Sequence, residues 1–186
     1  MNVASGWRAR RGFFVLSVAV LVLDQVTKVL AHHYLSDRRA VEIVPDFFNL
    51  WYSRNPGGLF GSFRSWDGPL RFVLLTLLPM VAIVFIAAFL ARTRAVDRPT
   101  LFGLALILGG ATGNLIDRLV RGEVIDFLDV YVAWPKLADW LVQQFGTAHW
   151  PTFNVADSSI VVGAGLLLVS IVRPQHSPEP DGTLPA

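Results

Sequence analysis

Four long apolar blocks dominate the chain, and short stretches rich in charged residues, glycine and proline separate them. The blocks cover residues 13–34, 72–91, 100–119 and 156–172. Each is close to the roughly 17–25 residues that a helix needs to cross a bilayer. The pattern therefore predicts an all-α integral membrane protein with four transmembrane helices, and Pro79 is expected to kink the second helix.

The two longest connections predict smaller elements outside the bilayer. Residues 41–44 and 47–53 are rich in β-branched and aromatic side chains, which predicts a small β-rich segment between helices one and two. Gly57 and Gly58 then suit a turn. Residues 134–145 carry large apolar side chains at helical spacing, with Pro135 suited to the first turn. We expect an interfacial helix between helices three and four, and the alternative is an aromatic anchor with no part in chemistry.

Composition supports a membrane protein of one domain. The chain has 186 residues, of which 53% are hydrophobic and 16% charged, and its mean hydropathy is +0.50. We expect a single domain over residues 1–173 and a disordered, proline-rich polar tail over residues 174–186. The absence of cysteine excludes thiol catalysis and disulfides. The basic residues form no stripe with interleaved aromatics, so nucleic-acid binding is not expected.

The arginines predict the orientation of the chain in the membrane. Arg8, Arg10 and Arg11 precede the first block, and Arg92, Arg94 and Arg98 crowd the short connection between the second and third blocks. Arginine-rich short flanks lie on the cytoplasmic side, so both termini are expected there and both long connections outside. A cleavable signal peptide is the alternative for the first block. The block continues past its ionisable residues with no small-residue cleavage site, which favours a retained helix.

Polar residues inside the apolar blocks need a partner or a function. Asp24 and Lys28 are four residues apart and share a helix face. They either form a self-neutralising pair that docks helix one or line a polar cavity, and both interpretations turn this face inward. Asn114, Asp117 and Arg118 also share a face, near the outer end of helix three.

Two further aspartates are candidate catalytic residues. Asp126 lies in a short apolar run, where it could simply pair with Arg118 or Arg121, and Asp157 opens the last block. With Asn154 as N-cap, Asp157 also fits a helix-start pattern. If the two carboxylates meet, they share a proton, and the pair can activate water and polarise a peptide carbonyl. The sequence contains no H-E-x-x-H or G-x-S-x-G motif, and its histidines show no ligand spacing, so no metal is expected.

Five segments, in this order, carry a resemblance to a known family: DQVTK at 24–28, RNPGGLFG at 54–61, GNLIDR at 113–118, VIDF at 124–127 and FNVAD at 153–157. The chain resembles bacterial lipoprotein signal peptidase, signal peptidase II, over nearly its whole length. Two features depart from the usual family pattern. The turn reads N-P-G-G-L-F, and the interval between Asp126 and Asp157 is longer, with the expected interfacial helix inserted there.

The resemblance implies a four-helix aspartyl endopeptidase of the bacterial inner membrane, with its site near the extracytoplasmic face. It would cleave diacylglyceryl-modified prolipoproteins on the N-terminal side of the lipidated cysteine, without metal or cofactor. Its partners would be these precursors, through their signal peptides, and membrane lipids, and it would act as a monomer. The implied catalytic residues are Asp126 and Asp157. The implied substrate-binding residues are Asp24, Lys28, Asn55, Gly57, Asn114, Arg118 and Asn154.

Two rival functions remain open from the residues alone. One is a small carrier or proton-relay protein, in which Asp24, Lys28, Asp117 and Asp126 form a polar pathway. The other is a non-catalytic membrane scaffold with the same fold. A carrier would spread its ionisable residues through the bilayer depth, whereas this chain concentrates them near one end of helices three and four.

Overall fold

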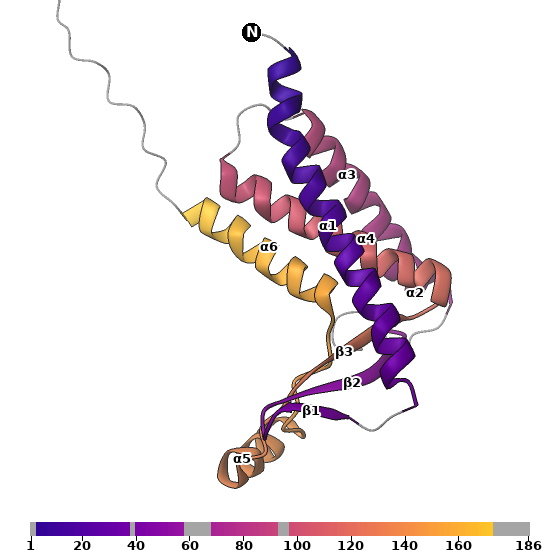
Figure 1. Cartoon of the computed structure of the whole chain (residues 1–186), viewed down its shortest axis with the longest axis vertical. Coiled ribbons are helices and arrows are strands. Elements are labelled where there is room, and N and C mark those ends of the chain that lie inside the picture. The colour runs from indigo at the N-terminus through magenta and orange to yellow at the C-terminus, as the bar shows by residue number, and fades with distance from the viewer. Residues whose placement is uncertain (1–2, 38–39, 58–67, 93–96, 173–186) are drawn as a thin grey trace, which may run out of the picture.

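Four helices long and apolar enough to span a membrane form the body of the protein, as expected (Figure 1). The computed structural model describes residues 3–37, 40–57, 68–92 and 97–172. The membrane-spanning parts are Arg10–Leu35 of helix α1 (Val3–Leu35), then Pro69–Arg92, helix α4 (Arg98–Arg121) and helix α6 (Val155–Val172). The expected disordered tail, residues 174–186, lies outside the described residues.

Helix α4 is the centre of the bundle, because its glycines let two other helices approach closely. A Cβ added at Gly109 would lie 2.5 Å from the backbone oxygen of Ser17 on α1. A Cβ at Gly110 would lie 2.5 Å from the backbone oxygen of Ala156 on α6. Small residues on α4 therefore let α1 and α6 pack closely on two neighbouring faces of one helix, as is common in membranes.

The helix of the second span is irregular over the residues that precede Pro79. The span begins as helix α2 (Pro69–Phe72), continues as a π-helical segment (Val73–Leu77) and ends as helix α3 (Leu78–Arg92). A proline lacks the N–H that an α-helix needs in its interior, and a π-helical turn is one way in which the preceding backbone adjusts. The kink expected from the sequence thus takes the form of a widened turn.

The sheet has three strands, one more than the sequence predicted. Strands β1 (Val41–Val44) and β2 (Phe48–Asn55) form the expected segment after α1. Strand β3 (Val124–Val130) follows α4 and pairs antiparallel with β2, in the order β1-β2-β3. The β-rich segment expected between helices one and two is therefore only part of the sheet, and β3 completes it. Because most of β3 is buried, the run has no polar alternation to mark it as a strand.

The sheet is joined to the C-terminal end of α1 by a small hydrophobic core. Ala31 and Leu35 of α1 are buried with Phe127 of β3. Leu50, Tyr52, Leu128 and Val155 pack around them. This core fixes the strand that carries Asp126 to the helix bundle.

Helix α5 (Pro135–Phe145) confirms the helix predicted between helices three and four, with Pro135 in its first turn. It lies at the end of the sheet away from the bundle (Figure 1). The segment after it returns to β3: Nδ1 of His149 lies 3.0 Å from a carboxylate oxygen of Asp129, and its ring stacks on Tyr131. No residue of α5 is buried.

Candidate active site

The two candidate aspartates come from different elements that meet at one end of the bundle. Asp126 lies on β3, opposite Ser53 of β2, and is 1% exposed. Asp157 lies in the first turn of α6 and is half-buried. Strand β3 follows α4 directly, and α6 packs closely on α4, so both side chains are held relative to the same helix.

Two linked asparagines join the carboxylates. Asn154 donates to Oδ1 of Asp126 at 2.7 Å and to Oδ1 of Asn114 at 3.2 Å. Asn114 in turn donates to Oδ1 of Asp157 at 2.8 Å. A continuous path of side-chain hydrogen bonds therefore connects Asp126 with Asp157.

Asn154 and Asp157 also begin α6 in the way that the sequence pattern predicted. The Asp157 amide donates to the Asn154 side chain at 2.9 Å, and the Asn154 amide donates to the Asp157 carboxylate at 3.3 Å. This reciprocal arrangement satisfies two backbone donors at the helix start. The helix-start interpretation and a role in a site are thus compatible, since Asn154 uses its oxygen for the cap and its NH₂ group for Asp126.

Lys28 is fully buried, and each of its three protons has an acceptor. Its Nζ lies 2.9 Å from Asp24, 2.9 Å from Asp117 and 2.8 Å from the side-chain oxygen of Asn114. Asp24 also accepts from the Ala156 amide at 2.9 Å, which ties α1 to the start of α6. Of the two interpretations of the Asp24–Lys28 pair, the structure supports a buried pair that docks α1 on its neighbours. Because Lys28 and Asp24 are each 0% exposed, they are inaccessible to a substrate in this conformation.

Asp117 is the buried residue whose importance for the site the sequence prediction missed. Its carboxylate contacts Lys28 and pairs with Arg121, and it accepts from the Ile125 amide at 3.3 Å. Ile125 directly precedes Asp126, so Asp117 fixes the start of the strand against α4. Its spacing of three residues from Asn114, on the same helix face, was the signal that could have identified it. Gln25 extends the group, with its NH₂ group 3.2 Å from Asp117.

The turn after β2 reaches Asp126 from the other side. Asn55 donates to Oδ2 of Asp126 at 3.0 Å, and the Gly57 amide donates to the Asn55 side-chain oxygen at 3.0 Å. Gly57 is buried, while Gly58 lies outside the described residues. The N-P-G-G-L-F turn thus retains the contact between its asparagine and the strand aspartate.

Arg118 stands apart from this network of hydrogen bonds. Its charge interacts with those of Asp157, Asp126 and Asp117, yet its buried Nε has no hydrogen-bond partner among the described residues. Neither Arg118 nor Arg121 forms an ion pair with Asp126, so the simple pairing considered for that aspartate is not observed. The site therefore contains a buried N–H donor beside two carboxylates.

Burial and a second carboxylate both disfavour the charged form of Asp126. Burial raises the pKa of Asp126 to about 7, and the negative charge of Asp157 adds to the rise. The hydrogen bonds from Asn55 and Asn154 oppose it. Asp126 therefore exchanges its proton close to neutral pH, which is suited to general acid–base chemistry. Among the described residues, no group of three or more His, Cys, Asp or Glu side chains could hold a metal ion.

Comparisons with known proteins agree on one family. The family model described as "Signal peptidase (SPase) II" matches residues 16–173. The lipoprotein signal peptidase of Solibacter usitatus is 38% identical over 170 residues, covering 91% of this chain and 93% of the relative. That of Geobacter metallireducens is 39% identical over 171 residues, covering 92% and 96%. That of Coxiella burnetii is 39% identical over 163 residues, covering 87% and 91%.

Solved structures support the same fold. Two structures described as bacterial membrane enzymes superimpose on this chain with TM-scores of 0.70 and 0.68, each at 25% sequence identity. Both alignments cover 87% of this chain, and they cover 87% and 93% of the respective solved chains.

Proposed function

This chain belongs to the signal peptidase II family, the lipoprotein signal peptidases, and we propose that it hydrolyses prolipoproteins with Asp126 and Asp157 as its catalytic pair. The protein is an aspartic-type membrane protease that processes lipoprotein precursors. The finer proposal is that it cleaves diacylglyceryl-modified precursors on the N-terminal side of the lipidated cysteine and releases the signal peptide. The observation that best supports this proposal is the path of hydrogen bonds Asp126–Asn154–Asn114–Asp157, in which two asparagines link the two carboxylates.

The charges around the pair favour a single shared proton. Four carboxylates, of Asp24, Asp117, Asp126 and Asp157, lie near three cations, of Lys28, Arg118 and Arg121. One proton on the catalytic pair makes the numbers of negative and positive groups equal. Because the pKa of Asp126 is raised to about 7, we assign that proton to Asp126 at neutral pH. Asp157 lies at the positive end of α6 and accepts from Asn114 and from a backbone amide, contacts that favour its ionised form, so we assign the negative charge to it.

These assignments give each carboxylate a role. Asp157 takes a proton from the water that attacks the carbonyl carbon, while Asp126 gives its proton to the carbonyl oxygen, so that a tetrahedral carbon with two hydroxyl groups forms. As the C–N bond breaks, Asp157 passes its proton to the leaving nitrogen, and Asp126 takes a proton back from one hydroxyl, which leaves a carboxylic acid and an amine. No covalent bond to the protein forms in this sequence.

The other predicted site residues divide into two roles. We expect the half-buried Asn55 and Arg118 to meet substrate, and the Nε of Arg118 suits a peptide carbonyl. Gly57 is buried, so its proposed role is to orient Asn55 through its amide. Asn114 and Asn154 hold the carboxylates. Asp24 and Lys28 are fully buried, so we revise their expected role from substrate contact to positioning.

The proposed orientation places the site at the extracytoplasmic face of the inner membrane. The end of α3 at Arg92 and the start of α4 at Arg98 lie at the opposite end of the bundle from the sheet (Figure 1). Reporter fusions after position 94 and within residues 131–147 should report opposite sides of the membrane. A common side for both fusions would refute the orientation.

Helix α5 is proposed to lie on the outer membrane surface and to guide the diacylated substrate. Trp134, Trp140 and Phe145 are 53%, 51% and 69% exposed, although they are the largest apolar side chains of the segment. Exposed aromatic side chains on an amphipathic helix are typical of the membrane interface. A substrate with two acyl chains approaches laterally from lipid, and a helix on the membrane surface would guide it.

The carrier hypothesis finds no support in this arrangement. Lys28 pairs with Asp24 and Asp117, and Asp117 accepts from the Ile125 amide next to Asp126. These residues form one cluster and no path across the bundle. The direct test of the proposed function uses the purified full-length protein and a synthetic precursor with an S-diacylglyceryl cysteine. Mass spectrometry should find one cut before that cysteine. The same peptide with an unmodified cysteine should remain intact, and equal cleavage of both would contradict the proposed substrate.

A further inference from the structure

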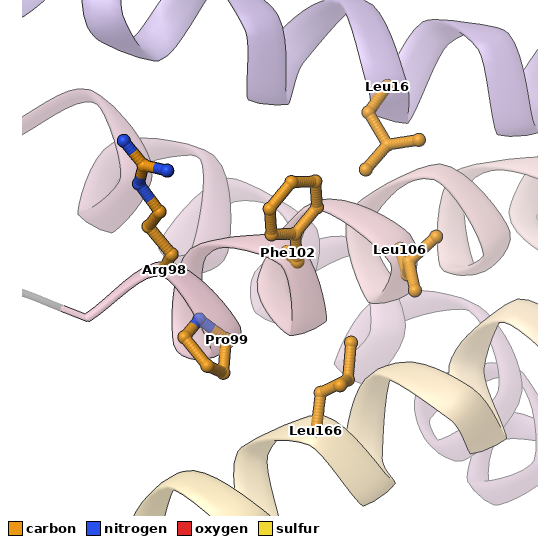
Figure 2. A pocket seen from close by; sticks show the side chains of 6 residues that line it. All are labelled: Leu16, Arg98, Pro99, Phe102, Leu106 and Leu166. Atoms are coloured by element: carbon orange, nitrogen blue, oxygen red, sulfur yellow. The ribbon is translucent and has the colours of Figure 1, made fainter.

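An apolar groove lies between α1, α4 and α6 (Figure 2). It lies at the start of α4, whereas Asn114 and Asp117 of the candidate active site lie toward the other end of this helix. Leu16 of α1 and Leu166 of α6 form its two walls, and Phe102 and Leu106 of α4 lie between them. Arg98 and Pro99, at the start of α4, close one end. The cavity measures about 470 Å³.

The groove exists because α1 and α6 both pack on α4 but not on each other at this depth. On the α1 side, Phe13 packs edge-on against Phe102 with ring centroids 5.1 Å apart. On the α6 side, a Cβ at Gly103 would lie 2.7 Å from the backbone oxygen of Gly163. Between these contacts Phe102 remains 46% exposed. The floor of the groove is therefore open to whatever surrounds the spanning helices.

Within the part of the chain that the structure describes, Arg98 is the only charged residue that lines the groove, and it has no ion-pair partner. The neighbouring Asp97 is engaged elsewhere, because its carboxylate accepts from the hydroxyls of Thr100 at 2.6 Å and Ser170 at 2.7 Å. A guanidinium at the end of a hydrocarbon-lined groove matches an anionic group with an apolar chain. Arginine binds phosphate with particular strength, through two parallel N–H donors.

We propose that this groove binds a diacyl phospholipid, with one acyl chain between α1 and α6 and the phosphate on Arg98. The three helices that line the groove, α1, α4 and α6, all span the membrane, so bilayer lipid surrounds the groove. From Arg98 to Leu106 the helix rises roughly 12 Å, at about 1.5 Å per residue, which fits within one leaflet of a hydrocarbon core about 30 Å thick. In the proposed orientation this is the cytoplasmic leaflet.

The size of the cavity favours a lipid chain over a peptide helix. A helix about 10–12 Å across occupies on the order of 400–600 Å³ for each 5.4 Å turn. A cavity of about 470 Å³ therefore holds little more than one turn of a signal-peptide helix, but it can hold a length of acyl chain. The bound lipid would bridge α1 and α6 where the protein itself leaves them apart.

Native mass spectrometry of the full-length protein in detergent tests this site without any substrate, so its result is independent of the proposed peptidase activity. The probes are dioleoyl phosphatidylglycerol and dioleoylglycerol, which share acyl chains but differ in the phosphate. The wild type should retain one phosphatidylglycerol and bind dioleoylglycerol at least about tenfold more weakly, as expected for loss of a charge-assisted contact. Equal retention of both lipids would overturn the assignment of the phosphate to Arg98.

Variants separate the two parts of the site. Arg98→Gln should remove the preference for the phosphate, whereas Arg92→Gln, an exposed cation at the same end of the bundle, should keep it. Leu106→Trp and Leu166→Trp fill the groove from different helices and should abolish retention. Ile171→Trp, at an 80% exposed position on α6, should bind as the wild type does. Wild-type retention in either groove-filling variant, or an Arg92→Gln effect equal to that of Arg98→Gln, contradicts the proposal.

Discussion

Asn154 and Asn114 are hydrogen-bonded to each other, with Nδ2 of Asn154 3.2 Å from Oδ1 of Asn114, and each also donates to one of the two aspartates. The same Asn114 oxygen accepts from Lys28 at 2.8 Å. This orients the Asn114 amide, because its oxygen faces two donors and its NH₂ group must face Asp157. The positions of both carboxylates thus depend on a buried lysine that neither of them contacts directly.

Two substitutions at Asn154 should separate its cap from its contact with Asp126. Serine is as good an N-cap as asparagine but lacks the NH₂ group, whereas alanine lacks both functions. Asn154→Ser should therefore stay folded and lose on the order of 10²-fold in kcat. Asn154→Ala should show a similar loss and, in addition, a lower melting temperature in detergent, because a lost N-cap costs about 1 kcal/mol. Wild-type turnover in Asn154→Ser would show that the contact with Asp126 is dispensable.

The glycine that faces Asp24 should tolerate no side chain. A Cβ at Gly113 would run into the Asp24 carboxylate, which is held between Lys28 and the start of α6. Gly113→Ala should therefore lower the melting temperature and the activity together. Gly165→Ala is the matched control, because a Cβ there meets nothing within 4 Å. Equal stability of the two variants would show that α1 and α4 can separate without cost.

Cleavage should decline as the pH rises through about 7, the raised pKa of Asp126, because the proposed mechanism needs Asp126 protonated. The hydrogen bond from Asn55 lowers this pKa, so Asn55→Ala should raise it and move the decline to higher pH. Rate profiles of both proteins on the lipidated peptide make the comparison. A decline that stays in place or moves to lower pH in Asn55→Ala would contradict the assignment of the proton.

The same pKa has a consequence for stability. The folded-state value of Asp126 lies above the ordinary value of 3.8, so the folded protein binds the proton more tightly than the unfolded chain does. This contribution is fully present below pH 3.8 and is lost as the pH rises through about 7. The melting temperature of the wild type should therefore fall relative to that of Asp126→Asn over this interval.

The sequence predicted the spans because each is a long apolar block, and it predicted α5 because its large side chains follow helical spacing. It did not predict β3, since a run buried on both faces shows no alternation. It gave the candidate aspartates but not their connection, which depends on how Asn114 is oriented by Lys28 from another helix. Contacts of this kind follow from packing at Gly109, Gly110 and Gly113, and no local pattern encodes them.

Helix α5 should affect substrate capture more than chemistry. Trp140 and Phe145 pack edge-on with ring centroids 6.0 Å apart on its exposed apolar face. In proteoliposomes, replacing both with serine should raise KM for the lipidated precursor several-fold and leave kcat unchanged. The matched control replaces Gln143 and Gln144, which are also exposed, with serine. If both double variants keep the wild-type KM, α5 has no part in substrate capture.

The central claim is that Asp126 and Asp157 act as one catalytic pair, and single-turnover rates of their asparagine variants test it most directly. Asp126→Asn and Asp157→Asn are each expected to lose 10²-fold or more in the rate of cleaving the lipidated precursor, with the fold intact, since each removes one half of the general acid–base pair. The double variant should be little slower than either single variant, because residues that act as a unit are not additive. Substantial cleavage by either purified single variant, or losses that multiply in the double variant, would contradict the account.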